Sequence, residues 1–247
     1  MQPVLEATAY LEHLRTDIDR ILATPASALG ASVAACPGWT VEDLLGHHEG
    51  VFRFALAQIR AEPGSDLVPF DPPEEDVDRL AAFGEVAEAL YEDLLVLDPT
   101  EHRPNWANLA DSSFYFRRMA QESAIHRWDA EAAHTDPTPI DPGLAVDGVE
   151  ELAEVFLVHA ERRGITGSGE TVHLHATDDG LPEGAGEWMF TFHEHGVDVE
   201  HAHGKGDMAV RGPASDLLLF AWNRRPIEAD TFGDPDPLTW WPANVSI

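Results

Sequence analysis

The sequence predicts an α+β protein of two domains, a four-helix bundle followed by a domain with a mainly antiparallel sheet. Three observations support this prediction. Apolar residues recur at helical spacing through the first half of the 247-residue chain. A proline-rich segment, 136–143, then interrupts the pattern. Beyond about residue 170 the hydrophobic period changes from 3.6 to 2, as in strands. We therefore expect domains at 1–138 and 139–247.

Four amphipathic stretches of the first half are each long enough for a helix of the bundle. The second of them has a clear start, because Thr40 follows a Pro-Gly break and Asp43 lies three residues later, in the position of a capping box. The four predicted helices lie at about 3–24, 40–61, 75–97 and 112–133.

The second half is expected to begin with a helix at about 145–163 that ends at Gly164. Alternating patterns then predict strands, and Pro213 suits the start of a further helix. The predicted strands lie at 171–178, 187–195, 197–203 and 206–211. The tail after Arg225 gives no clear pattern.

The charge balance restricts the partners of the chain. Acidic residues number 45 and basic residues 15, with Lys205 the single lysine, for a formal net charge of −30. Such a field repels phosphate backbones and anionic lipids, so we expect neither a nucleic acid nor a membrane as partner. The single cysteine, Cys36, excludes an intramolecular disulfide, and we expect a packed or partly exposed thiol there. No signal peptide or long apolar stretch is recognisable, which predicts a cytoplasmic protein.

Glu122 and His126 are candidate metal ligands on the predicted fourth helix. Residues four apart share one helix face, so a carboxylate and an imidazole at this spacing can hold one ion. The opposite face, with Arg117, Gln121 and Arg127, is expected to meet solvent. Spacing alone leaves the alternative of an exposed pair without an ion.

His47 is the candidate third ligand, on the predicted second helix. Its neighbours at i−3, i+4 and i+7 are apolar, so we expect His47 to point to the core and His48 and Glu49 to lie off that stripe. An inward imidazole that faces a Glu/His pair on another helix is typical of metal sites in bundles. A hydrogen-bonded structural histidine is the alternative.

Two segments resemble the signatures of the mycothiol-dependent maleylpyruvate isomerase family, within the wider DinB-like superfamily of helical bundles. The first is CPGWTVEDLLGHHEGVFRF (36–54), which contains His47, and the second is RRMAQESAIHRWDAE (117–131), which contains Glu122 and His126. The second half, including DMAVRGPASDLLLFAWNRRP, is similar to the family's sterol-carrier-protein-like C-terminal domain.

The resemblance implies a metal-dependent enzyme with His47, Glu122 and His126 as ligands, zinc being the default ion. It also implies mycothiol, a low-molecular-weight thiol, as cofactor, and a small electrophilic substrate. The metal-activated thiolate would add to a double bond, and rotation and elimination would complete a cis–trans isomerisation; release of the adduct would instead be an S-transfer. Arg224, or the adjacent Arg225, would bind a carboxylate. Asp129 could orient a ligand, but an ordinary helix charge is slightly favoured.

Two other classes of function stay open: a non-enzymatic ligand-binding or regulatory protein that retains the metal site, and a thiol-independent metal hydrolase. The substrate and the oligomeric state also stay open. Three His-x-His pairs on predicted strands raise the alternative of a second metal site, although a polar sheet face is the favoured interpretation. These pairs are His173/His175, His193/His195 and His201/His203.

Overall fold

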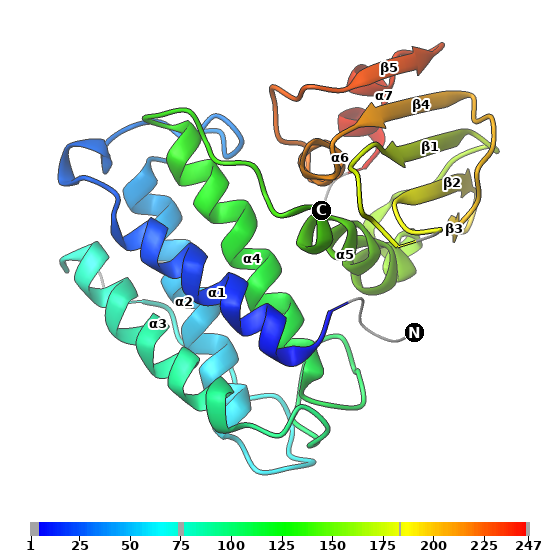
Figure 1. Ribbon diagram of the computed structural model, residues 1–247. Coiled ribbons are helices and arrows are strands. Elements are labelled where there is room, and N and C mark those ends of the chain that lie inside the picture. The colour runs from blue at the N-terminus through cyan, green and yellow to red at the C-terminus, as the bar shows by residue number, and fades with distance from the viewer. Residues whose placement is uncertain (1–4, 74–76, 183, 246–247) are drawn as a thin grey trace. The chain divides into compact units, whose positions relative to one another are not determined.

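The computed structural model describes residues 5–73, 77–182 and 184–245, and Figure 1 shows their helices and strands. The chain divides into two compact units, Met1–Thr138 and Pro139–Ile247. The first unit is helical and the second carries a sheet with helices, so the predicted α+β class is confirmed.

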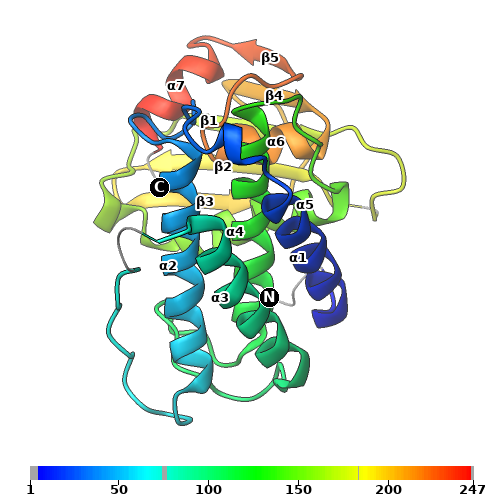
Figure 2. The same cartoon turned by 90° about the vertical axis from the view of Figure 1, so that its left-hand side faces the viewer.

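The first unit is a bundle of four long helices, seen from two sides in Figures 1 and 2. They are α1 (Ala7–Leu22), α2 (Val41–Arg60), α3 (Arg79–Val96) and α4 (Ser113–Ala132), with the short helix η1 (Ala26–Ala28) after α1. Helix α1 packs against α4, and α2 against α3. Parts of the predicted first and third helices, residues 3–4 and 75–76, lie outside the described residues. No helix within the described ranges is long and apolar enough to cross a membrane.

The predicted capping box starts α2. The Asp43 amide donates to the Thr40 hydroxyl (3.2 Å), and the Thr40 amide donates to the Asp43 carboxylate (2.8 Å). These bonds satisfy two amides that the first helical turn would otherwise leave without partners. Helix α3 starts in a similar way, because the Asp78 carboxylate accepts from the Ala81 amide. Local side-chain chemistry thus sets where these helices begin.

Helix α4 is buried on nearly all sides, and the predicted solvent face is wrong for Gln121 and Arg127, while Arg117 is half-buried. Gln121 and Arg127 are only 2% and 3% exposed. The guanidinium of Arg127 donates to Asp17 of α1 (3.0 Å) and to Glu131 (3.1 Å). It also donates to the backbone oxygen of Thr138. Charged side chains can be buried here because α1 and the end of the unit supply partners for them.

The second unit begins with a helical segment that ends at Gly164, as predicted, where φ is +73°. Asp141 caps its first turn through the Gly143 and Leu144 amides. The helical segment changes from α-helical to π-helical to 3₁₀-helical turns along its length and is not one regular helix. Its parts are α5 (Pro142–Glu151), the π-helix η2 (Leu152–Phe156), and the 3₁₀ helices η3 (Leu157–His159) and η4 (Glu161–Arg163).

The sheet of the second unit has, within the described residues, the strand order β3-β2-β1-β4-β5. Neighbouring strands are antiparallel except for β1 and β4, so the sheet is mixed but mainly antiparallel, as expected. The strands are β1 (Thr171–Ala176), β2 (Glu187–His193), β3 (Gly196–Glu200), β4 (Met208–Gly212) and β5 (Asp230–Gly233). The predicted third strand was too long, since β3 ends before His201. Strand β5 and helix α7 (Pro237–Asn244) lie in the tail that had no prediction.

One face of this sheet forms the core of the unit. Helix α6 (Ala214–Ala221) packs on β1 and β4, and Trp241 of α7 contacts the rings of Phe190 and Phe192 on β2. The Trp188 indole on the same face donates to Glu150 of α5 (2.7 Å). Strand residues alternate between faces, so His173, His175 and Glu187 lie on the opposite face.

The buried Arg127 cluster predicts a large stability effect. We expect Arg127→Met to lower the free energy of unfolding by about 3 kcal/mol, because Asp17 and Glu131 lose a buried positive partner. Urea unfolding followed by circular dichroism measures this loss. Arg60→Met is the matched control, since the pair of Arg60 with Asp93 is largely exposed and should contribute about 0–1 kcal/mol. Equal losses in the two variants would contradict the role given to burial.

Candidate metal centre

Three potential ligand atoms of the bundle converge at one point. The Nε2 atom of His47 lies 3.3 Å from Oε1 of Glu122, and Nε2 of His126 lies 3.2 Å from the same oxygen. The three atoms all lie within 4.8 Å of one another. His47 comes from α2 and the other two residues come from successive turns of α4. The structure therefore brings together the three residues that the sequence singled out as metal ligands.

The segment before α2 contacts His47, one of these three residues. Gly38 takes a left-handed conformation (φ +89°), and the Thr40 backbone forms a β-bridge with Ser32. Trp39 is thereby placed with its ring centroid 5.2 Å from that of His47. The Pro-Gly-Trp-Thr stretch thus packs an indole against the His47 imidazole.

The triad is buried on the α4 side and open on the α2 side. The side chain of His47 is 39% exposed, against 15% for Glu122 and 10% for His126. The prediction that His47 points to the core is therefore wrong. His48 and Glu49, predicted to lie off the apolar stripe, are the buried residues, at 1% and 3% exposure.

The buried residues next to His47, which are His48 and Glu49, have hydrogen-bond partners on other helices. His48 contacts the Ser123 hydroxyl (3.3 Å) and packs against Phe52. Its burial, with His126 nearby, holds the pKa of His48 well below its ordinary value, so this imidazole is neutral. Glu49 accepts from Arg79 of α3 (2.7 Å).

Glu122 and His126 on α4 are held in place by charged neighbours. Arg118 donates to Oε2 of Glu122 (2.6 Å), which leaves Oε1 directed at the two imidazoles. Asp129 lies 3.1 Å from Nδ1 of His126. An ionised carboxylate only accepts, so Nδ1 carries a proton and the ring is held with Nε2 directed at Glu122. Asp129, which the sequence slightly favoured as an ordinary helix charge, therefore orients His126.

The pKa shifts of Glu122 and His126 show that each group stabilises the charged form of the other. Burial alone would raise the pKa of Glu122, but His126 and Arg118 hold it well below its ordinary value. Burial would lower the pKa of His126, yet Glu122 and the hydrogen bond to Asp129 outweigh it and raise that pKa to about 9. Without a metal ion, His126 is therefore a buried imidazolium at neutral pH.

The donor set suits a divalent transition-metal ion such as zinc. Two imidazole nitrogens and one carboxylate oxygen are among zinc's usual ligands, and second contacts fix the orientation of two of them. Three protein ligands with one open side are typical of a catalytic rather than a closed structural site. The described residues of the bundle thus fit such an ion without rearrangement of its helices.

The remaining candidates lie elsewhere. Arg224 follows α6 in the second unit, is partly buried, and donates to the Trp222 carbonyl (2.9 Å). Arg225 stacks on the ring of Phe220 (4.9 Å) and donates to the Arg224 carbonyl (2.6 Å), so its guanidinium is already engaged in the local fold. Cys36 is partly exposed on the segment before α2, as expected.

Comparison with known proteins places both units in one family. The family description "Mycothiol maleylpyruvate isomerase N-terminal domain" matches residues 11–131, and "MDMPI C-terminal domain", of the same family, matches residues 143–243. No curated protein matches the sequence significantly.

Two similar solved structures support the same fold. A crystal structure of the mycothiol-dependent maleylpyruvate isomerase has a TM-score of 0.62 at 15% identity, with 94% of this chain and 95% of that chain covered. A histidine-to-alanine mutant of that enzyme has a TM-score of 0.57 at 14% identity, with 93% and 96% covered. Because the two domain descriptions match successive parts of the chain and together span most of it, the chain belongs to the mycothiol-dependent maleylpyruvate isomerase family.

Proposed function

We propose that this protein is a metal-dependent enzyme that uses mycothiol to isomerise a small unsaturated electrophile, with maleylpyruvate as the first substrate to test. The observation that carries the proposal is the convergence of His47, Glu122 and His126 around a point that is open on the His47 side. Family membership supplies the thiol and the substrate class.

A divalent ion held by these residues would stabilise a thiolate and so provide a nucleophile at neutral pH. Residues around the triad would orient its side chains and leave room for a ligand. Arg118 holds the Glu122 carboxylate, and Asp129 keeps the lone pair of His126 directed at the ion. The exposed edge of His47 leaves room for a ligand from solvent. Trp39 restricts the orientation of the His47 ring.

Arg224 is proposed as the residue that binds a substrate or cofactor carboxylate. A guanidinium can donate two parallel hydrogen bonds to a carboxylate, which fixes its orientation. Arg225, whose guanidinium stacks on Phe220 and donates to backbone oxygens, is the alternative.

Metal content and thiol binding test the proposal directly. We expect about one equivalent of metal at the bundle site, lost in His47→Ala, because two remaining ligands hold the ion poorly. Elemental analysis measures the metal, and calorimetry with and without a chelator measures mycothiol binding. His134→Ala, an exposed histidine near the end of α4, is the control that should keep the ion.

The outcomes separate the functional classes. Metal-dependent mycothiol binding with turnover of maleylpyruvate supports the isomerase. Thiol binding without turnover of electrophiles would favour a binding or regulatory protein. Turnover that does not respond to mycothiol would favour a hydrolase. A folded wild type whose metal content is unchanged by His47→Ala would contradict the triad.

Metal binding to the triad should release a proton. The pKa of His126 is raised to about 9 in the metal-free protein, so the imidazolium must lose its proton before Nε2 can bind an ion. The affinity for zinc should therefore rise by about tenfold per pH unit up to pH 9. Calorimetry at pH 7 in buffers of different ionisation enthalpy counts the protons that are released.

In the metal-free state the paired His126 imidazolium stabilises the fold fully below pH 6.5, and this contribution is lost as pH rises through 9.

Substitutions at the two adjacent arginines should have different kinetic effects. We expect Arg224→Ala to lower kcat/KM by about 100-fold or more, since a bidentate charged contact contributes several kcal/mol. Arg225→Ala should mainly lower the melting temperature, because it removes the stacking on Phe220. Steady-state kinetics and thermal unfolding of both variants check this. The reverse pattern would transfer the carboxylate contact to Arg225.

A further inference from the structure

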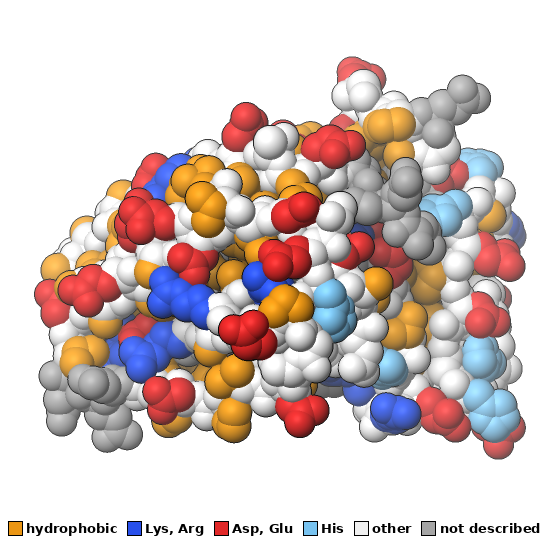
Figure 3. All heavy atoms as spheres, turned by 90° about the horizontal axis from the view of Figure 1, so that it is seen from below, with side chains coloured by type: hydrophobic (Ala, Val, Ile, Leu, Met, Phe, Trp, Pro, Cys, Tyr) orange, Lys and Arg blue, Asp and Glu red, His pale blue; other side chains and the backbone are white. Residues whose placement is uncertain are grey.

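Histidines and carboxylates gather on the face of the sheet that the helices of the second unit leave uncovered. Figure 3 shows pale-blue imidazoles among red carboxylates at its right-hand edge. Four residues of the second unit form a compact group, which we call the sheet cluster: His173, His175, Glu187 and His203. None of them belongs to the triad in the bundle.

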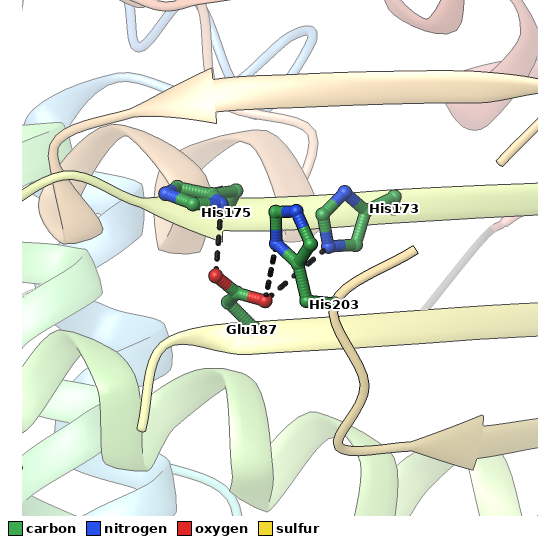
Figure 4. Close-up of side chains that lie close together, drawn as sticks. All are labelled: His173, His175, Glu187 and His203. Atoms are coloured by element: carbon green, nitrogen blue, oxygen red, sulfur yellow. Dashed lines mark hydrogen bonds and ion pairs between the residues drawn. The ribbon is translucent and has the colours of Figure 1, made fainter. Parts of the chain in front are cut away.

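The sheet cluster surrounds one carboxylate, as Figure 4 shows. Nδ1 of His175 lies 3.0 Å from Oε1 of Glu187, and Nδ1 of His203 lies 2.9 Å from Oε2. Nε2 of His173 lies 3.9 Å from Oε2. One ligand atom from each residue lies within 4.8 Å of the others. For comparison, a tetrahedral zinc ion with bonds of about 2.0–2.1 Å separates its donors by roughly 3.3 Å.

The strand register explains three members of the sheet cluster. His173 and His175 are two residues apart on β1, so they share a face, and Glu187 of β2 pairs directly with His175. These positions are fixed by backbone hydrogen bonds and not by the side chains themselves. The three groups would be adjacent even without attraction between them.

The fourth member, His203, lies on a short loop that crosses the sheet. Strands β3 and β4 are separated in the sheet by β2 and β1, so residues 201–207 must cross both strands. Seven residues span at most about 25 Å, and three strand spacings take up roughly 14 Å of this, so the loop stays close to the face. A Cβ on Gly206 would lie 3.1 Å from the His173 amide, which shows how closely the loop approaches β1. Asp207 closes the loop through hydrogen bonds with Thr171 of β1.

Hydrogen bonding alone does not satisfy the sheet cluster. The two oxygens of Glu187 contact His175 and His203. Nε2 of His173 is buried and has no hydrogen-bond partner. The His173 side chain is 7% exposed, so water does not readily replace the missing partner. A hydrogen bond between the His173 ring and the Ala202 backbone orients this nitrogen toward the cluster. A buried polar atom without a partner requires an explanation.

We propose that the sheet cluster is a second metal site, which binds a divalent ion such as Zn²⁺ through His173, His175, His203 and Glu187. Three imidazoles and one carboxylate are a donor set for late first-row transition ions, whereas Mg²⁺ and Ca²⁺ prefer oxygen ligands. Four protein ligands fill a tetrahedral shell, so this site is structural, in contrast to the open triad of the bundle. The ion joins the crossing loop to β1 and β2.

The other histidines of the second unit provide matched controls. His201 is two residues before His203 on the same loop, but it contacts Glu150 (3.4 Å), which lies on the opposite side of the sheet. His193 and His195 contact Asp198 and Glu161, and they do not join the sheet cluster. Of the three predicted His-x-His pairs, His173/His175 stays together in the sheet cluster, His201/His203 separates, and His193/His195 lies outside it, so the site is built across strands.

The test is a count of metal ions on the full-length protein after removal and controlled return of zinc. We expect two equivalents per chain in the wild type and one in His203→Ala, whose exposed side chain can be removed without a cavity. His201→Ala should retain two. His126→Ala should also lose one, but from the bundle, so failure of the proposed function and failure of the sheet site give different results. Cobalt absorption spectra identify which tetrahedral site has been lost.

Thermal unfolding gives a second readout. Zinc should raise the melting temperature of the His126→Ala variant, and His203→Ala or His175→Ala in the same background should abolish that rise. Equal zinc content and equal zinc-dependent stabilisation in His203→Ala and His201→Ala would overturn the second site. Retention of a single equivalent in His126→Ala that is lost on adding His203→Ala would establish it.

Discussion

The bundle depends on the pairing of charges along α4, a helix whose residues are mostly buried. Arg118, Glu122, His126, Arg127, Asp129 and Glu131 are all on this helix and are largely withdrawn from water. Each burial is tolerable only where an opposite charge or a hydrogen bond compensates for lost solvation. Asp17 of α1 and Arg118 of α4 itself provide such partners. The same requirement that stabilises the packing also fixes the Glu122 carboxylate between two imidazoles, so the candidate metal centre is part of the bundle's charge pairing.

Periodicity and capping were sufficient to predict the longer helices, because these signals lie within a few residues of one another. The Thr40–Asp43 box and the end at Gly164 are examples. The orientation of His47 was not predictable in this way. Its apolar neighbours on the helix predicted a core position, but the residues buried there are His48 and Glu49, which contact Ser123 and Arg79, 75 and 30 residues away. The short β5 and the Pro-containing α7 were missed because neither shows a sustained period.

The sheet shows a second limit of sequence reasoning. Each His-x-His pair suggested a chelate along one strand, but the residues that meet come from β1, β2 and a crossing loop. Glu187 carried no signal of its own, since its relevance depends on the register with His175. A one-residue shift of register would move every such side chain to the other face. Long-range pairing therefore decides which histidines converge, and a single sequence does not encode it in a readable form.

The two proposed metal sites differ in the number of their protein ligands. A protein with a net charge of −30 repels an anionic substrate, so a site for such a substrate needs local positive charge. With two neutral imidazoles and one carboxylate, a divalent ion at the triad retains a net charge of about +1 and keeps an open side. At the sheet cluster the ligands carry the same total charge, but a fourth protein donor completes the shell. The proposed ion there attracts no substrate directly and can only hold the loop. Ligand number, not ligand charge, therefore separates the proposed catalytic role from the proposed structural one.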